Sequence, residues 1–303
     1  MLFEWVKQDS GYGQIMMRVE DFEEYRQINL ALAGLIHKMD GSSQMKKMLN
    51  HVCSSGGKKI RPLILMLSTE VCGGDMNKSI DAALSIELIH SASLIHDDLL
   101  DGGILRRGMP SAHEKYGVAA ALLCGDFLIS KAITLISSYG HDAVYEFGSA
   151  GMYMAEGETI DIKSVNEEFR QKNYFDCINK KTASLFASSA AIGAYIAGCS
   201  KDEALRFHAF GENVGIAYQV VDDLLEFLEE LEDKKSTQES VTLPQIFNRA
   251  LGREEAVKRT IAEVHRYVGF AKDLLSTFRP CAAREKLLQI TDYITVDLLP
   301  GTI

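Results

Sequence analysis

Three aspartates and two arginines stand close together in the stretch HDDLLDGGILRR, from His96 to Arg107. On a helix, Asp97 and Asp101 lie four residues apart on one face, with Asp98 beside them. Two ionised carboxylates about 5.5 Å apart repel each other by roughly 3 kcal/mol at an effective dielectric constant of about 20. The cluster therefore needs a cation, and hard oxygen ligands without a neighbouring histidine-cysteine set favour Mg²⁺ over zinc.

The same stretch continues with residues suited to a phosphate. Gly102 and Gly103 are expected to end the helix, because glycine readily takes the left-handed conformation found after helix C-termini. Arg106 and Arg107 then offer fork-shaped donors that match phosphate oxygens. A divalent metal together with these arginines predicts a polyphosphate substrate.

A second acidic cluster lies in YQVVDDLLEF, from Tyr218 to Phe227. An acidic triplet alone is weak evidence, since 42 of the 303 residues are Asp or Glu and such a triplet can be the solvated end of a helix. Two acidic stripes on facing helices could instead share metal ions. The stripe expected on the second helix is Gln219, Asp222, Asp223 and Glu226. The predicted metal ligands are Asp97, Asp98, Asp101, Asp222, Asp223 and Glu226.

With its two acidic motifs, the sequence resembles the all-trans isoprenyl diphosphate synthases, the polyprenyl synthetase family. Within that family it resembles the geranylgeranyl and geranylfarnesyl diphosphate synthases. Further family blocks occur in order along nearly the whole chain: GGKKIRP at Gly56 to Pro62, ELIHSASLIHDD at Glu87 to Asp98, GDFL at Gly125 to Leu128, KTASLF at Lys181 to Phe186, and VTLP at Val241 to Pro244. The resemblance implies one domain over residues 1–303 with the isoprenoid synthase fold, a single large helical bundle around a central cavity.

The resemblance also implies two diphosphate sites. Isopentenyl diphosphate, the homoallylic substrate, is expected at Lys58, Arg61 and Arg107. His90 is a further candidate there, although a lone histidine on an apolar helix is more often a satisfied core residue. The allylic diphosphate is expected at Arg106, Lys181 and Gln219. The residues expected to serve catalysis are Asp97, Asp101, Arg106, Lys181, Thr182, Gln219 and Asp222.

The chain departs from the family pattern in two places. Glu226 stands where a third aspartate is usual, which keeps a carboxylate on a side chain one methylene longer. The loop that follows is several residues short, and Ser240 occupies the position of a family lysine. Lys234 or Lys235 is a candidate substitute for that lysine.

The reaction implied by the resemblance is ionisation of an allylic diphosphate, head-to-tail attack by isopentenyl diphosphate and loss of a proton, with Mg²⁺ as cofactor. Short-chain members carry an aromatic residue just before the first acidic motif, whereas this chain has Ala92 and Ser93. We therefore expect an all-trans product longer than farnesyl, geranylgeranyl or geranylfarnesyl diphosphate, with Ile89 as a partial floor of the product channel. The alternatives are a farnesyl diphosphate synthase (geranyltranstransferase), a non-catalytic partner subunit of a heteromeric synthase, and a terpene cyclase.

The elements that must position these residues are helices. Apolar residues recur with a 3.6-residue period in nearly every segment, most clearly over Ser79 to Asp101, Glu167 to Gly198 and Asp202 to Glu230, and about a dozen helices are expected. The fold class is therefore all-α. A length of 303 residues would allow two domains, but a single large helical unit is also permitted, and we expect one.

Composition limits the partners and the compartment. A formal net charge of -10 argues against binding of nucleic acid, which depends on Lys and Arg. The six cysteines form no CxxC pair, and the first residues lack a signal peptide, so we expect reduced thiols in a cytoplasmic protein. The uncharged stretch Thr182 to Ser200 is rich in small residues, which favours close packing in a bundle over a membrane span. A homodimer is expected.

Overall fold

The computed structural model describes residues 18–39, 41–54, 56–164, 168–233 and 240–299. Within these ranges the chain folds into thirteen α-helices, joined by short turns, which confirms the all-α prediction. The strands of the described part are β1 (Leu105–Arg106) and β2 (Met109–Pro110), an antiparallel pair of two residues each. The prediction for Lys234 and Lys235 concerns residues outside the described ranges.

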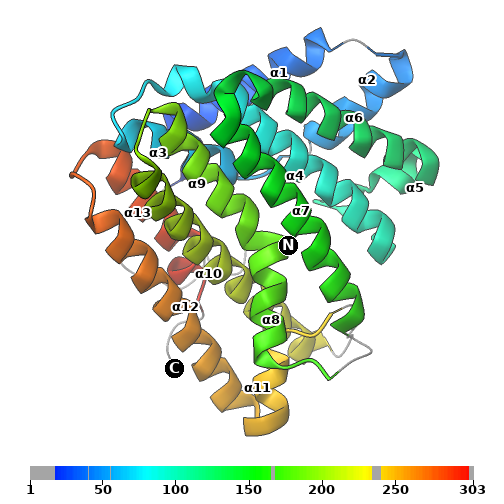
Figure 1. Ribbon diagram of the computed structural model, residues 1–303. Coiled ribbons are helices and arrows are strands. Elements are labelled where there is room, and N and C mark those ends of the chain that lie inside the picture. Colours follow the sequence, from blue (N-terminus) through cyan, green and yellow to red (C-terminus); the bar gives the residue numbers. More distant parts are fainter. Residues whose placement is uncertain (1–17, 40, 55, 165–167, 234–239, 300–303) are drawn as a thin grey trace.

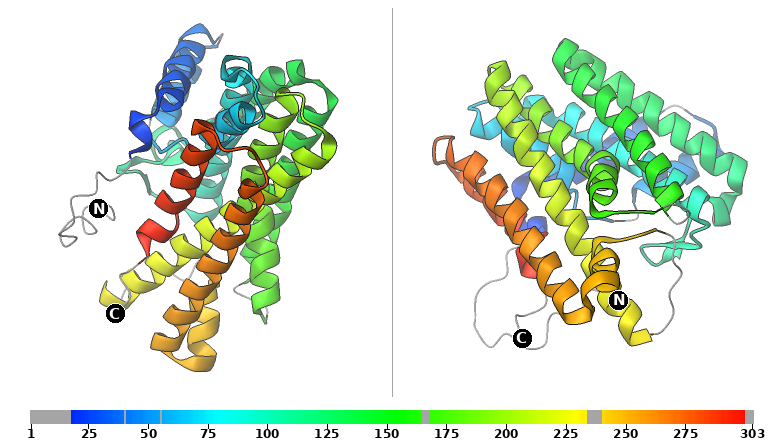
Figure 2. Two further views of the ribbon diagram at one scale, coloured as in Figure 1. Left: turned by 90° about the vertical axis from the view of Figure 1, so that its left-hand side faces the viewer. Right: turned by 60° about the horizontal axis from the view of Figure 1, so that its bottom comes forward.

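The first half of the bundle extends to the end of α7, and its helices are α1 (Glu23–Lys38), α2 (Ser43–Cys53), α3 (Ile60–Val71), α4 (Ile80–Asp101), α5 (Ala112–Tyr116), α6 (Val118–Ile136) and α7 (Gly140–Ser164). The second half contains α8 (Gln171–Ile178), α9 (Ser184–Ile196), α10 (Lys201–Asp233), α11 (Leu243–Leu251), α12 (Arg253–Ser276) and α13 (Ala282–Tyr293). A π-helical turn, Asn179–Ala183, joins α8 to α9. Figures 1 and 2 show α5 and α6 on one flank of the bundle and α12 and α13 on the other.

Helix α9 forms the interior of the bundle. Every residue from Ser184 to Ala194 is buried, and the helix packs against α3, α7 and α10. Small residues make this packing possible: a Cβ placed on Gly193 would lie 2.2 Å from the carbonyl oxygen of Leu65, and one on Gly211 would lie 2.3 Å from that of Phe186. The uncharged sequence of this segment thus belongs to a core helix surrounded by protein.

A different segment has the apolar character of a membrane span. Among the described residues, Val118–Ser164 is long and apolar enough to cross a membrane, judged by length and composition alone, and 33% of its apolar window is buried inside the fold. Large apolar side chains on α6 and α7 are exposed, and they include Val118, Leu122, Leu123, Ile133, Val144, Tyr145, Met152 and Tyr153.

Both acidic motifs lie on long helices, as expected. Helix α4 runs to Asp101 and is ended by Gly102, which has a φ of 68° in the left-handed region. Helix α10 carries the second motif well inside its 33 residues. The six cysteines are free, and burial raises the pKa of Cys53 to about 12 and that of Cys124 to about 11. These two thiols are therefore protonated core side chains.

Candidate active site

The three aspartates of the first motif differ in burial and in their partners. Asp98 is 5% exposed, and its Oδ1 accepts a hydrogen bond from Nε of Arg106 at 3.0 Å and a second from Nη2 at 2.5 Å. Asp97 is half-buried and Asp101 is exposed. Arg106 lies at the end of β1, so the short hairpin after α4 brings the guanidinium back to the middle aspartate. Asp98 therefore has an arginine partner inside the protein.

Asp97 faces carboxylates that the sequence analysis did not select. Its pKa is raised to about 7, first by burial and then by the nearby carboxylate of Glu158, while Lys181 acts in the opposite direction. Glu158 lies on α7, a helix for which no site residue was predicted. An excess of negative charge therefore surrounds Asp97, and a divalent cation would relieve it.

Lys181 is held by two carboxylates of α7. Its Nζ lies 2.7 Å from Oε2 of Glu158 and 2.6 Å from Oδ2 of Asp161. Although burial disfavours the ammonium form, Asp161 and Glu158 raise the pKa of Lys181. The signal for these residues in the sequence was the acidic pair at i and i+3 in GETID, on a helix face that otherwise carries small and apolar residues.

The residues of the second acidic motif differ in burial. Asp222 and Glu226 are exposed, whereas Asp223 is 7% exposed. The predicted stripe lies on one side of α10, but Asp222 and Asp223 point about 100° apart around the helix and so meet different neighbours. The oxygens of Asp223 accept hydrogen bonds from the Tyr174 hydroxyl at 2.6 Å and from Nε2 of Gln219 at 2.8 Å.

A chain of hydrogen bonds links Thr182 to this buried aspartate. The Thr182 hydroxyl donates to Oε1 of Gln219 at 2.8 Å, and the amide of Gln219 in turn donates to Asp223. Burial raises the pKa of Asp223 to about 7, although the hydrogen bonds from Tyr174 and Gln219 lower it. Asp223 therefore fixes the orientation of Gln219, and Gln219 fixes that of Thr182.

The π-helical turn lets two consecutive residues serve different neighbours. Lys181 reaches α7 and Thr182 reaches α10, although the two are adjacent in sequence. Gly157 of α7 lies directly against this turn, since a Cβ there would be 2.3 Å from the backbone nitrogen of Lys181. A cavity of about 120 Å³ opens beside them and is lined by residues that include Asp161, Lys181, Thr182, Gln219, Asp223 and Glu226.

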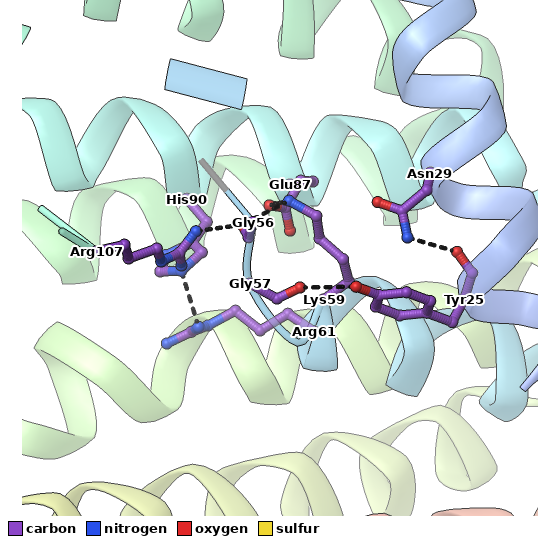
Figure 3. Close-up of polar contacts among 9 residues, drawn as sticks. All are labelled: Tyr25, Asn29, Gly56, Gly57, Lys59, Arg61, Glu87, His90 and Arg107. Carbon is purple, nitrogen blue, oxygen red and sulfur yellow. Dashed lines mark hydrogen bonds and ion pairs between the residues drawn. The ribbon is translucent and has the colours of Figure 1, made fainter. Parts of the chain in front are cut away.

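A basic loop lies between α2 and α3 (Figure 3). Nη1 of Arg61 lies 3.3 Å from Nε2 of His90, and the Arg61 guanidinium stacks over the ring of Phe186 at 4.3 Å. Nη1 of Arg107 donates to the carbonyl oxygen of Gly56. The structure thus gathers Arg61, His90 and Arg107 at the predicted basic site.

The side-chain partner of His90 is Arg61. Burial and then the charge of Arg61 lower the pKa of His90 well below its usual value, so the ring is neutral. A neutral ring can accept a hydrogen bond from Arg61 through Nε2. Lys58 lies nearby with its Nζ 4.4 Å from the ring centre of Tyr293. Burial raises the pKa of Asp222, whereas the neighbouring Arg61 and Lys58 lower it, so the second acidic motif adjoins this basic loop.

The donor set fits a hard divalent cation only in part. In the described residues no group of three or more His, Cys, Asp or Glu side chains is close enough to form a metal cage. The exposed carboxylates of Asp101, Asp222 and Glu226 offer oxygen ligands of the kind that Mg²⁺ prefers. An incomplete oxygen cage of this type suits a metal that arrives together with a diphosphate, whose oxygens supply the remaining ligands.

The face of α4 that leads to Asp97 approaches α7. Asp97 lies near Glu158, and Ile89, two turns earlier, reaches toward Gly151, two turns before Glu158. Ala92 is buried, and Ser93 uses its hydroxyl to bond the carbonyl of His90 at 2.9 Å. Ala92 and Ser93, between Asp97 and Ile89, are therefore small, whereas His96 on the same face packs against Gly125 of α6.

Two groups of cationic side chains thus contact α4: Arg61 reaches His90, and Arg106 reaches Asp98. Residues 42–267 match the family model for polyprenyl synthetase, and the chain belongs to that family. Its catalytic class is that of a prenyltransferase.

Relatives and solved structures agree over most of the chain. The chain is 54% identical to a geranylfarnesyl diphosphate synthase of Methanosarcina mazei, over 95% of this chain and 97% of the relative. It is 30% identical to a geranylgeranyl diphosphate synthase of the same organism, over 83% and 89% of the two chains. The crystal structure of a geranyltranstransferase from Methanosarcina mazei superposes with a TM-score of 0.83 at 52% identity, covering 93% of this chain and 100% of that one.

Proposed function

We propose that this prenyltransferase condenses isopentenyl diphosphate head-to-tail with an allylic prenyl diphosphate, uses Mg²⁺, and releases an all-trans product longer than farnesyl. The observation that carries the proposal is the placement of two anion-binding groups around α4. The basic group is Lys58, Arg61 and Arg107, with His90 oriented by Arg61. The other group combines Asp97 and Asp101 with Arg106 and Lys181.

The allylic diphosphate belongs at the second group. Lys181 and Arg106 would neutralise its oxygens, and Asp97, Asp101 and Asp222 would hold the metal. Bound Mg²⁺ would supply positive charge that stabilises the departing diphosphate. Lys181 and Arg106 are already oriented by carboxylates before substrate binds, so their donors require little reorganisation as charge develops on the leaving group.

The homoallylic diphosphate belongs at the basic loop. Lys58, Arg61 and Arg107 bring three positive charges together, with Arg61 held by His90 and Arg107 by the carbonyl oxygen of Gly56. Thr182 and Gln219 are hydrogen-bonded to each other and line the same cavity as Lys181, and their oxygen atoms would stabilise a cation formed there. We nominate no side chain as the base that removes the final proton.

The proposed product is geranylfarnesyl or geranylgeranyl diphosphate. Small side chains at Ala92 and Ser93 leave room beneath Asp97, and the relative at 54% identity is named for geranylfarnesyl diphosphate. The farnesyl alternative is supported by the name of the structural neighbour, a geranyltranstransferase. The non-catalytic subunit is opposed by the intact set of Asp97, Arg106 and Lys181.

The test is product analysis of the purified protein. Labelled isopentenyl diphosphate is supplied with geranyl, farnesyl or geranylgeranyl diphosphate, with and without Mg²⁺, and the products are separated by chain length. We expect 20- or 25-carbon products that require the metal. Accumulation of farnesyl diphosphate alone supports the farnesyl alternative, and absence of turnover with every primer supports the non-catalytic one.

We further propose a cytoplasmic homodimer, with the whole chain, 1–303, as one domain. The exposed apolar side chains of α6 and α7, Leu122 at 48%, Leu123 at 59% and Met152 at 69% among them, need a cover, and a second copy of the chain supplies one with the same face. Light scattering on a sizing column should give twice the 33.5 kDa of the chain. A Leu123→Glu variant should give the monomer, and a wild-type protein that needs detergent to stay in solution would favour a membrane instead.

A further inference from the structure

Lys59 is a charged residue that lies inside the protein in an unfavourable backbone conformation. Its φ is 51°, in the left-handed region that residues with a Cβ rarely adopt. Its side chain is 4% exposed, and its Nζ lies 2.7 Å from Oε1 of Glu87, whose side chain is 5% exposed. Both charges of the pair are therefore largely removed from solvent.

The ammonium of Lys59 also reaches back to its own loop. Its Nζ lies 3.4 Å from the carbonyl oxygen of Gly56, and the same carbonyl accepts the hydrogen bond from Nη1 of Arg107. The next carbonyl, that of Gly57, accepts a hydrogen bond from the Tyr25 hydroxyl at 3.3 Å. Figure 3 shows these contacts converging on the loop between α2 and α3.

The fit between the loop and Arg107 is close. A Cβ placed on Gly57 would lie 2.7 Å from Nη1 of Arg107, so the guanidinium rests against the bare backbone. Arg107 itself has a φ of 52°. Small movements of the loop would therefore displace the guanidinium, since no space separates them.

Residues on one face of α4 contact both Lys59 and Arg61. Glu87 and His90 are three residues apart on the helix, and they contact Lys59 and Arg61, which are two residues apart on the loop and the start of α3. Glu87 thus fixes the loop that supports Arg107, while His90 fixes Arg61. Replacing a buried ion pair by apolar residues of similar volume is often neutral for stability, so stability alone does not explain why the pair is present.

We propose that Lys59 and Glu87 form a positioning pair for the homoallylic diphosphate site: the pair holds Lys59 left-handed and the Gly56 carbonyl in place, and through that carbonyl it fixes Arg107. The proposal rests on the proposed function, in which Lys58, Arg61 and Arg107 bind isopentenyl diphosphate. The pair touches no substrate, and its effect is confined to one of the two diphosphate sites.

The test separates positioning from stability by replacing both charges. In the single variant Lys59→Met, Glu87 is left buried without a partner, and the melting temperature should fall by roughly 10 °C. In the double variant Lys59→Met/Glu87→Met, the melting temperature should return to within about 4 °C of wild type. The double variant should nevertheless keep a KM for isopentenyl diphosphate raised by about tenfold or more, with the KM for the allylic diphosphate unchanged.

A Lys–Glu pair elsewhere in the fold, with a buried carboxylate and a Lys286 side chain that is 31% exposed, serves as the control. Lys286 and Glu24 join α13 to α1 with an Nζ to Oε1 distance of 2.5 Å, and Glu24 is 2% exposed. The double variant Lys286→Met/Glu24→Met should leave both KM values unchanged. A shift of the isopentenyl KM in this control would overturn the proposal, because any loss of a buried pair would then have the same effect.

The variant Lys58→Ala distinguishes failure of this inference from failure of the proposed function. A raised isopentenyl KM in Lys58→Ala, with an unchanged one in the double Met variant, overturns the positioning role and leaves the site intact. Unchanged values in both variants overturn the site and the inference together. If the double Met variant does not fold, the isosteric Glu87→Gln carries the test: a raised isopentenyl KM alone supports the proposal, and an unchanged one overturns it.

Discussion

The Cδ1 atom of Ile89 on α4 lies 3.5 Å from the position that a Cβ would take on Gly151 of α7. The Ile89 side chain thus spans the space between α4 and α7, because Gly151 has no side chain of its own. Between Ile89 and Asp97 the face carries the small residues Ala92 and Ser93, and the one bulky side chain nearer to Asp97, His96, packs against Gly125 of α6. Ile89 and Gly151 together are suited to form the floor of the product channel.

Product length should respond to substitutions at this floor. Ala92→Phe should shorten the main product by one or more isoprene units, because the ring would fill the space above Ile89, about 8 Å from Asp97 along the helix. Ile89→Ala should lengthen it. Chromatography of the dephosphorylated products measures both.

Substitutions of Gly151 on α7 test the same floor from the opposite helix. A methyl group there makes only ordinary contact with Ile89, so Gly151→Ala should fold and keep the wild-type product, whereas Gly151→Ile should shorten it. If the wild-type product already stops at farnesyl diphosphate, another helix sets the floor and this reading is wrong.

The aspartates of the first motif should differ in their importance. Asp97→Ala and Asp222→Ala should lower turnover by more than about 1000-fold, since loss of a metal ligand removes charge stabilisation in the transition state. Asp98→Asn should cost only about tenfold, because its effect reaches the substrate through Arg106. Single-turnover rates at saturating Mg²⁺ measure the difference, and equal losses at Asp97 and Asp98 would contradict it.

The two arginines after α4 should serve different substrates. Arg106 is directed to Asp98 and Arg107 to the Gly56 carbonyl, so their side chains diverge. Each Lys replacement keeps the charge and loses the fork of donors. Arg107→Lys should raise the KM for isopentenyl diphosphate and Arg106→Lys that for the allylic diphosphate, each by about tenfold. An effect of Arg107→Lys on the allylic KM alone would contradict the assignment.

The carboxylates around Lys181 should affect rate more than binding. In Asp161→Asn the ammonium loses one of two partners and becomes less well oriented, while the site also loses a repelling charge. We expect kcat to fall about tenfold with less than about a threefold change in the allylic KM. The neighbouring Lys180 bonds Glu156 and Asp176 at the surface, and Lys180→Ala should leave both constants unchanged.

Stability without substrate should fall as pH rises from about 4 to 7. The folded pKa of Asp223, about 7, exceeds its ordinary value of 3.8, so the folded state binds more protons than the unfolded state in this window. Ionising the buried group above pH 7 costs roughly 4 kcal/mol. Urea unfolding in EDTA at pH 5 and pH 8 should show a smaller loss for Asp223→Asn than for wild type, and an equal loss would contradict the assignment.

Regular helical periodicity was enough to predict the fold class and the ends of the motif helices. The predicted Ser79 to Asp101 became α4, Ile80–Asp101, and Asp202 to Glu230 became α10, Lys201–Asp233. Of the predicted stretch Glu167 to Gly198, the described part is helical from Gln171 to Ile196 and contains the π turn, which periodicity over so long a window does not resolve. The hairpin at Leu105–Pro110 was not predicted, because two-residue strands leave no alternating pattern.

The polar contacts of the site depend on neighbours that sequence spacing does not specify. Glu158 and Asp161 were missed because α7 carries no recognised motif near Lys181, and only packing brings the helices together. Asp98 and Asp223 share motifs with exposed carboxylates, yet Arg106 and Tyr174 determine where they point. Arg106 lies eight residues after Asp98, and Tyr174 lies on another helix from Asp223, so the difference in burial within each motif could only be seen in three dimensions.

The π turn at Asn179–Ala183 is equivalent to the insertion of one residue into an otherwise continuous helix formed by α8 and α9. Deleting Asn179 would let the chain from α8 to α9 close into an ordinary α-helix, with a more regular ladder of backbone bonds. The same deletion would rotate everything before it by about 100° relative to α9. Tyr174 would then lose its hydrogen bond to Asp223, and the backbone that precedes Lys181 would rotate by the same angle. The orientation of α8 and α9 relative to the site thus depends on a single residue in the π turn. A regular helix at this point would give a less active enzyme.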